Sequence, residues 1–255
     1  MKTKIIAVSN NKGGSGKTTL SGNLAYCLAK MGKKTLMIDA DMQMNLTRSY
    51  DFTQDKQNSL YTAIINEDDL NGYIRNTSYE NLDMIISDYM LSAVDMKMIN
   101  KQNKEHIIKN MLNPVIQKQV YDYIIIDTCP FLGILNYNIL VASNYVLIPV
   151  ELSAFGIEGL EPLSDFIGEV KIFNSGLDIL GIVETKVDNR ESTTQETRTL
   201  LKELFSSKVL GSSIPVDINI KKSQFAGVPV CDYMPSSRAS LWYLELAKEV
   251  DSIVS

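Results

Sequence analysis

The sequence predicts an α/β fold, in which a mostly parallel sheet is covered by helices on both faces. Short apolar runs rich in Ile, Val and Leu recur along the chain, and segments with helical periodicity separate them. A glycine-rich loop also joins the first apolar run to the first helical segment. The 255 residues fit a single domain, residues 1–255, because α/β folds often exceed roughly 200 residues as one unit.

The glycine-rich loop lies between a strand expected over residues 5–8 and a helix expected over residues 20–31. It departs from the standard P-loop pattern, which has glycine where Asn11 stands. Its glycines allow backbone N–H groups to point at a phosphate, and the helix that follows adds its positive end. We therefore expect a nucleotide phosphate to bind these loop residues: Lys12, Gly13, Gly14, Ser15, Gly16, Lys17, Thr18 and Thr19.

Three residues of the loop have distinct expected roles. Lys17 follows the last glycine and can reach the β- and γ-phosphates, and the Thr18 hydroxyl can ligate Mg²⁺. Lys12 adds a second lysine near the start of the loop, where it is either functional or a solvated loop residue. The run Lys-Gly-Gly-Ser-Gly-Lys-Thr-Thr resembles the deviant Walker A motif of the ParA/Soj/MinD family of ATPases. The resemblance implies ATP-dependent homodimers in which Lys12 reaches the phosphates on the facing subunit and acts in catalysis with Lys17.

A second strand, over residues 34–39, ends in the segment Asp39-Ala40-Asp41-Met42-Gln43-Met44-Asn45. This segment is similar to the family's D-x-D-P-Q-x-N segment, with Met42 in place of proline. The resemblance implies that Asp41 orients or activates the attacking water and that Asp39 lies near the Mg²⁺ shell. A carboxylate at the C-terminal end of a strand lies beside the phosphate loop, which suits both roles.

A run of strand-forming residues at 123–126 ends in Asp127 and is typical of Walker B, whose carboxylate holds Mg²⁺ or its water. Thr18, Asp39 and Asp127 are thus the expected metal residues, and ATP and Mg²⁺ the expected cofactors. Cys129 stands where the family has proline. A related iron protein of nitrogenase holds a cluster near this point, but no second cysteine matches here, so we expect Cys129 to be a small buried residue.

The rest of the chain continues the alternation of helix and strand. We expect helices over residues 60–65, 89–119, 157–173 and 238–254, and strands over residues 82–86, 145–151 and 179–183. The last helix has a broad apolar stripe and carries acidic residues beside its single lysine, Lys248. It is therefore expected to dock on the core and not on a lipid surface.

The end of the strand over residues 179–183 and a later turn compete as the site of base recognition. Thr185-Lys186-Val187-Asp188 has the Thr-Lys-x-Asp pattern by which signal-recognition GTPases hold guanine. Ile214-Pro215-Val216-Asp217 looks like the turn that MinD-like members place beside adenine. We expect Thr185, Lys186, Pro215 and Asp217 to contact an adenine nucleotide, and a GTPase switch remains the alternative.

The net charge of −5 does not by itself indicate a nucleic-acid binder. Residues 1–185 hold 16 basic against 21 acidic residues, whereas residues 186–255 hold 9 of each, so the acidic excess lies in the first part. ParA-like proteins bind DNA through basic residues near the adenine turn. The resemblance and the remaining basic residues suggest a DNA-binding patch of Arg190, Lys221 and Lys222, although these can also be ordinary surface charges.

The sequence also bears on location. No apolar run approaches the about 18 residues of a membrane-spanning helix, and residues 1–10 are too short for a signal peptide. The three cysteines have no paired spacing, so neither a disulfide framework nor a zinc site is indicated, and a reducing cytoplasm fits best.

The resemblance extends along nearly the whole chain and implies a ParA-type partition ATPase, cytoplasmic and nucleoid-associated. Such a protein binds DNA without sequence preference and hydrolyses ATP slowly, stimulated by a ParB-like centromere-binding partner, during plasmid or chromosome segregation. No membrane partner is expected. The alternatives are a MinD-like membrane-associated positioning ATPase, a tyrosine autokinase on the same fold, and the GTPase switch.

Overall fold

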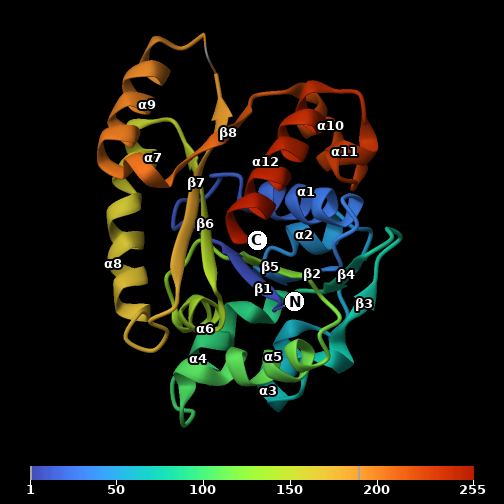
Figure 1. Ribbon diagram of the computed structural model, residues 1–255. Helices are drawn as coiled ribbons and strands as arrows, with labels where there is room; N and C mark the ends of the chain where they lie inside the picture. Colours follow the sequence, from blue (N-terminus) through green and yellow to red (C-terminus); the bar gives the residue numbers. More distant parts are fainter. Residues whose placement is uncertain (1, 189) are drawn as a thin grey trace.

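The computed structural model describes residues 2–188 and 190–255, which form an eight-stranded sheet in the order β3-β4-β2-β5-β1-β6-β7-β8 (Figure 1). The strands are β1 (Lys4–Val8), β2 (Thr35–Ala40), β3 (Arg75–Asn76), β4 (Leu82–Ile85), β5 (Tyr123–Thr128), β6 (Tyr145–Glu151), β7 (Asp178–Val187) and β8 (Val209–Pro215). All neighbouring pairs are parallel except β3 with β4. The prediction of a mostly parallel sheet is confirmed.

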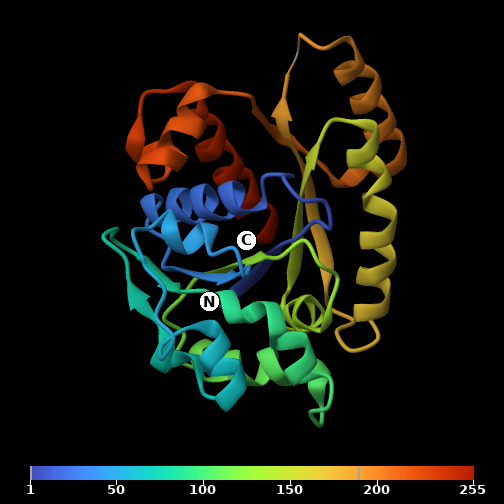
Figure 2. The same ribbon diagram turned by 180° about the vertical axis from the view of Figure 1, so that it is seen from behind.

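Helices cover both faces of this sheet (Figures 1 and 2). The α-helices are α1 (Lys17–Lys30), α2 (Asn45–Arg48), α3 (Leu60–Asn66), α4 (Val94–Met98), α5 (Ile107–Gln117), α6 (Ile134–Ala142), α7 (Ala154–Glu158), α8 (Leu160–Val170), α9 (Ser192–Phe205), α10 (Ile218–Ala226), α11 (Val230–Tyr233) and α12 (Arg238–Val254). Short 3₁₀ helices occur at Leu70–Tyr73, Tyr89–Ala93, Lys104–His106 and Ser206–Lys208.

The core consists of two apolar layers, one on each face of the sheet. Alternate residues of β1 serve the two layers: Ile5 and Ala7 pack with helices α3 to α6 and α8, whereas Ile6 and Val8 pack with α1 and α12. Side chains of a strand point to opposite faces in turn, so a strand covered on both sides needs an unbroken apolar run. This is why the central strands could be recognised from the sequence.

Two of the expected helices are divided in the structure, and this part of the prediction was wrong. Within residues 89–119, Asn103 adopts a left-handed φ of 50°, which separates α4 from the 3₁₀ turn that leads into α5. Within residues 157–173, Gly159 lies between α7 and α8. The last helix, in contrast, matches the expected bounds and docks on α1 and β8.

Strand β8 and helix α9 were not predicted from the sequence. Strand β8 lies at the sheet edge and contains Gly211, Ser212 and Ser213, so it lacks the apolar run of a central strand. Among the described residues, no helix combines the length and the apolar character that crossing a bilayer requires.

Candidate nucleotide-binding site

The C-terminal ends of the central strands bring the three predicted motifs together. Parallel pairing sets Asp127 of β5 opposite both Val8 of β1 and Asp39 of β2. The loop between β1 and α1 therefore begins beside the two carboxylates. This juxtaposition is the arrangement expected of a site at the carboxyl edge of a parallel sheet.

The loop conformation depends on two of its glycines. Gly14 has a φ of 77° and Gly16 a φ of 90°, a left-handed region in which a side chain would be strained. The Thr185 hydroxyl of β7 donates a hydrogen bond to the Ser15 carbonyl at 2.8 Å and so holds the loop against the sheet. The Ser15 hydroxyl is itself buried and has no hydrogen-bond partner among the described residues.

The side chain of Lys17 is buried within the loop. Its Nζ donates to the Lys12 carbonyl at 3.2 Å. Burial lowers the pKa of Lys17, and the nearby charges of Asp127 and Asp41 act in the opposite direction. A lysine held in this way gains a favourable charge partner when an anion enters the loop.

Asp127 is fully buried and incompletely satisfied. Its Oδ1 accepts from the Ser21 hydroxyl at 3.0 Å, whereas its Oδ2 has no hydrogen-bond partner among the described residues. Burial, and then the neighbouring charge of Asp39, raise the pKa of Asp127 to about 8. A cation beside Oδ2 would supply the missing partner, because buried carboxylates are normally paired or bound to a metal.

Asp39 fixes the segment that follows β2. Its Oδ2 accepts from the Thr47 amide at 2.8 Å and the Thr47 hydroxyl at 2.7 Å, and its Oδ1 accepts from the Asp41 amide at 3.1 Å. Burial raises the pKa of Asp39 to about 6. With both oxygens engaged, Asp39 positions Asp41, and Asp127 is the better placed of the two carboxylates for a metal ion.

Asp41 is also buried and directly follows the end of β2, at the same edge of the sheet. Its carboxylate accepts from the Gln43 amide at 3.0 Å, and its carbonyl accepts from the Ser87 hydroxyl at 2.6 Å. The next residue, Met42, exposes 42% of its surface, so the segment turns outward immediately after Asp41. The Asp-x-Asp segment thus supplies two buried carboxylates. Asp39 anchors the segment, and Asp41 lies near Lys17 of the phosphate loop.

Lys12 is held by residues that sequence reasoning missed. Its Nζ donates to the Ser153 hydroxyl at 3.1 Å, and its amide donates to Asn10 Oδ1 at 2.8 Å. Asn10 in turn donates to the Pro149 carbonyl of β6 at 2.7 Å. Asn10 and Ser153 follow the ends of β1 and β6, and a polar residue at the end of a buried strand was the signal that could have found them.

The expected base-binding residues lie on two adjacent strand ends. Thr185 of β7 pairs with Ile214 of β8, and Pro215 ends β8. Lys186 adopts a left-handed φ of 52° and directs its Nζ to within 3.7 Å of a Glu151 carboxylate oxygen. Asp217 begins α10 by accepting from the Asn219 amide at 2.7 Å.

The three basic residues of the expected DNA patch have different surroundings. Arg190 forms an ion pair with Asp188, to which its amide donates at 3.0 Å and its Nε at 2.8 Å. Lys221 and Lys222 are exposed on α10. On the same short helix Phe225 is 95% exposed.

Cys129, expected to be buried, is only half-buried. Its Sγ lies 3.7 Å from the Phe131 carbonyl and 3.6 Å from Asn136 Oδ1. The Asn136 amide donates to the Cys129 carbonyl at 2.8 Å and to the Phe131 carbonyl at 2.6 Å. These bonds hold the loop after β5 against α6, in which Asn136 lies.

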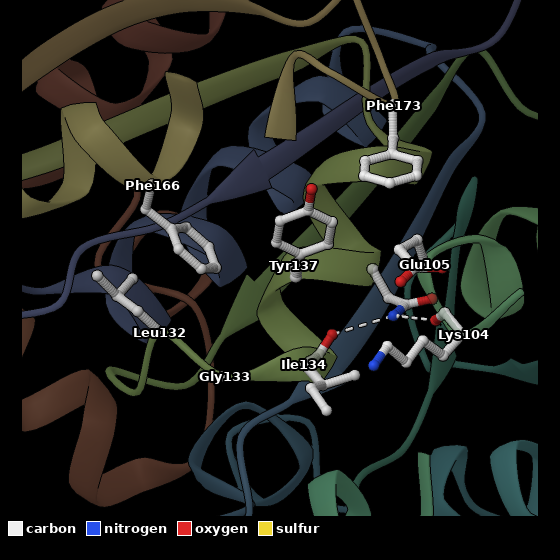
Figure 3. A pocket seen from close by; sticks show the side chains of 9 residues that line it. Lys104, Glu105, Leu132, Gly133, Ile134, Tyr137, Phe166 and Phe173 are labelled. Carbon is white, nitrogen blue, oxygen red and sulfur yellow. Dashed lines mark hydrogen bonds between the residues drawn. The ribbon is translucent and has the colours of Figure 1, made fainter. Parts of the chain in front are cut away.

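A separate apolar pocket of about 310 Å³ lies between α6, α8 and the 3₁₀ turn at Lys104–His106 (Figure 3). Asn138 closes one side by donating to the Lys104 carbonyl at 2.6 Å and the Ile134 carbonyl at 3.1 Å. Leu132 and Gly133, from the loop after β5, line it, but none of residues 12–19 does. This pocket is thus distinct from the phosphate loop.

The phosphate loop, the buried Lys17 and the two strand-end carboxylates together define a P-loop nucleotide-binding protein. Comparison with known proteins agrees, since a family model described as an AAA domain matches residues 3–179. The sporulation initiation inhibitor protein Soj of Bacillus subtilis is 38% identical over 249 residues, which cover 97% of this chain and 98% of Soj. The chain belongs to the ParA/Soj/MinD family of ATPases.

Other similar proteins extend the comparison. The chromosome-partitioning ATPase Soj of Treponema pallidum is 33% identical over 248 residues, covering 97% of this chain and 96% of that protein. Among solved structures, cobyrinic acid a,c-diamide synthase of Mycobacterium smegmatis, with bound ADP and magnesium, has a TM-score of 0.83 and 24% identity. That match covers 96% of this chain and 93% of the synthase. At this identity the likeness concerns the fold alone.

Proposed function

We propose that this protein is a ParA-type partition ATPase, which dimerises on ATP, binds DNA without sequence preference and segregates a plasmid or chromosome with a ParB-like partner. The observation that carries the proposal is Lys12, placed on the phosphate loop at the same sheet edge as Asp41 and Asp127. The related Soj of Treponema pallidum, which is named a chromosome-partitioning ATPase, supports it. The protein would act in the cytoplasm, associated with the nucleoid.

The residues at the site fit ATP and Mg²⁺. The buried Asp127 Oδ2, which has no partner among the described residues, suits a magnesium ion, and Thr18 would also ligate that ion. Asp39 would lie near the ion and hold Asp41 in place by accepting from its amide. Loop amides and Lys17 would hold the β- and γ-phosphates, and Pro215 and Asp217 would flank the adenine. The ion would neutralise charge that develops on the phosphates.

The chain's own residues then account for slow hydrolysis. Asp41 would hold the attacking water, and Lys17 would stabilise negative charge on the phosphate from within the loop. Lys12 would contribute a second positive charge to the facing subunit. Because Lys12 is bonded to Ser153 in this single chain, it must leave that contact to reach across, and this requirement would delay hydrolysis until two subunits meet.

The surface around the loop supports dimerisation. Three large apolar side chains are exposed in the segments that follow β2, β5 and β6: Met42 at 42%, Phe131 at 67% and Phe155 at 74%. All three follow the carboxyl ends of strands that flank the nucleotide site. Exposed apolar residues gathered around a functional edge are characteristic of a protein interface.

Helix α10 supports DNA binding through its two exposed lysines. Lys221 and Lys222 follow the turn at Asp217, so a nucleotide-dependent dimer would present four lysines, two from each subunit. Arg190 would contribute less, because Asp188 already neutralises it. Contacts of this kind reach backbone phosphates and release counterions, so binding should be independent of sequence and weaken steeply with salt.

DNA binding tests the proposal directly. The affinity for unrelated DNA fragments is measured with ATP and Mg²⁺ at several salt concentrations, for the wild type and for Lys221→Ala/Lys222→Ala. We expect the double variant to bind about 10-fold more weakly or worse and with a smaller salt slope. Lys202→Ala/Lys248→Ala, which removes the same charge from exposed positions on α9 and α12, should bind like wild type. A wild type that fails to bind DNA at low salt would contradict the proposed function.

A second candidate function is binding to an anionic membrane surface. Helix α10 exposes Ile218 at 60% and Phe225 at 95% beside its two lysines, a combination that also suits lipid headgroups. Sedimentation with anionic vesicles separates the two functions. Loss of vesicle binding in Phe225→Ala, with DNA binding absent in the wild type, would favour the membrane function.

A further inference from the structure

The segment containing α10 and α11 docks along one side of α1. Gln224 donates to the Thr19 hydroxyl at 2.7 Å, and the Val230 amide donates to Asn23 Oδ1 at 2.8 Å. Thr19 and Asn23 are four residues apart, so they lie on the same side of the helix. The helix that starts at the phosphate loop is therefore fastened to the segment that carries the exposed lysines.

Cys27 is the next residue on this side of α1, and it meets Cys231 of α11. The two Sγ atoms are 3.2 Å apart, although the residues are separated by 204 positions in sequence. Both are free thiols. A disulfide bond is about 2.05 Å long, so the sulfurs need to approach by only about 1 Å more. Two hydrogen bonds already hold α1 against α11 beside this pair: the Val230 amide donates to Asn23 Oδ1, and the Tyr26 hydroxyl donates to Asp232 Oδ1.

The two thiols are not equivalent. Cys27 is 1% exposed, whereas Cys231 is partly accessible. The hydrogen bond that Cys27 provides lowers the pKa of Cys231, and Lys30 acts in the same direction. The same hydrogen bond and burial raise the pKa of Cys27. Cys231 is therefore the thiol that ionises and is reached from solvent first.

We propose that Cys27 and Cys231 form a reversible disulfide, made by exchange with a low-molecular-weight disulfide such as oxidised glutathione. The Cys231 thiolate attacks one sulfur of the small disulfide, breaks its S–S bond and releases one thiolate. Cys27 gives its proton to the released thiolate and attacks the Cys231 sulfur of the mixed disulfide, and the second small thiolate leaves and takes up a proton from water. Two protein thiols are thereby oxidised and one small disulfide is reduced to two thiols.

The bond acts as a staple between α1 and α11. It lowers the conformational entropy of the unfolded chain by joining two positions far apart in sequence. In the folded protein it prevents α10 and α11 from separating from α1. Oxidation should therefore stabilise the protein and reduce opening of residues 218–233. These effects are independent of the proposed partition function, because none of their measurements uses nucleotide or DNA.

The proposal is tested on the folded full-length chain incubated with oxidised glutathione. Peptide mapping by mass spectrometry should find a Cys27–Cys231 link in the wild type and in Cys129→Ser, which keeps the pair. Cys231→Ser should form no intramolecular link. A link that appears only after denaturation, or one that joins Cys129, would overturn the pairing.

Thermal unfolding and amide hydrogen exchange test the staple. The oxidised wild type should unfold at a temperature on the order of 5–10 °C higher than the reduced protein, and a dithiol reductant should reverse the shift. Exchange in residues 218–233 should slow, while exchange in α8 stays the same. An unfolding temperature that does not rise when the link is present would overturn the staple, and Cys231→Ser should show no oxidation-dependent rise.

Discussion

At the scale of single residues, the site depends on a few side chains that the protein's own hydrogen bonds hold in place. Lys17 folds back on the loop, Asp39 anchors Asp41, and Lys12 is bonded to Ser153. Each contact is local to the carboxyl edge of the sheet. Two residue-level predictions follow from the roles that these contacts suggest.

We expect Lys12→Ala to abolish the ATP-bound dimer and Asp41→Ala to retain it while stopping hydrolysis. Lys12 would supply charge across the interface, whereas Asp41 would act only on the water, so the variants should separate assembly from chemistry. Light scattering with ATP and Mg²⁺ measures the first effect, and phosphate release should fall by about 100-fold or more in both variants. If both variants dimerise like wild type, the proposed role of Lys12 is wrong.

Asp127→Asn should stabilise the nucleotide-free protein at alkaline pH. Burial raises the pKa of Asp127 from 3.8 to about 8, so between these values the folded state binds a proton that the unfolded state has lost. The free energy of unfolding therefore falls as pH rises through this window. Asparagine cannot ionise, so it removes the cost of holding a buried carboxyl that would otherwise lose its proton. Urea unfolding at pH 8 should show a gain of roughly 1–3 kcal/mol that shrinks towards pH 4.

The matched control for this effect is Asp165→Asn, an exposed position on α8. It should leave the pH dependence unchanged. A stability difference between Asp127→Asn and wild type that is the same at pH 4 and pH 8 would show that titration of Asp127 is not its cause. ATP hydrolysis should be lost in Asp127→Asn alone.

At the scale of elements, the start of helix α6 is fixed by a side chain from another element. Helix α6, which follows the loop after β5, begins with the amides of Ile134 and Leu135 donating to the Asp95 carboxylate of α4 at 3.1 and 2.9 Å. A side chain added at Gly133 would lie 1.9 Å from an Asp95 oxygen, so this glycine is needed for the cap. The cap therefore connects the loop after β5, the Walker B strand, to helix α4.

Asp95→Ala should therefore destabilise the protein by about 1–2 kcal/mol, because the partly buried backbone amides of Ile134 and Leu135 lose their hydrogen-bond acceptor. Lys97→Ala, at an exposed position on the same helix, should change the free energy of unfolding by less than about 0.5 kcal/mol. Urea denaturation of both variants measures the difference. Equal stabilities would mean that Asp95 does not cap α6 in solution.

At the scale of the whole molecule, we propose that nucleotide choice depends on how β7 and β8 end side by side. Arg190 engages both oxygens of Asp188, the carboxylate that guanine recognition would need, whereas Asp217 uses Oδ1 for the start of α10. This arrangement supports our proposal that adenine lies at the turn after β8. Both carboxylates therefore make hydrogen bonds within the fold. Asp188 uses both of its oxygens, whereas Asp217 keeps Oδ2 for a ligand.

We accordingly expect ATP to bind at least about 10-fold more tightly than GTP, a difference of about 1.4 kcal/mol. Equilibrium titration of both nucleotides with Mg²⁺ measures the preference. Asp188→Asn should leave the preference for ATP unaltered. Asp217→Asn keeps an oxygen to accept from the Asn219 amide, so it is the matched substitution at the turn after β8. A preference for GTP that disappears in Asp188→Asn would reverse this assignment.

Local sequence determined much of the fold and most of the phosphate site. The central strands are unbroken apolar runs because they are covered on both faces, and Gly14 and Gly16 are required by the left-handed backbone of the loop. Both signals lie within a few consecutive residues. The edge strand β8 and the divided helices lack such signals, which is why their bounds could not be predicted.

The tertiary structure alone decided which distant side chains meet. Lys12 contacts Ser153, Asp95 caps α6, and Cys27 lies against Cys231 although the two cysteines are 204 residues apart. No spacing in the sequence encodes these contacts, because they depend on the order of strands in the sheet and on how α10 and α11 return to α1. The sequence by itself determined the chemistry available at the carboxyl edge, and the packing of remote elements decided which groups hold it in place.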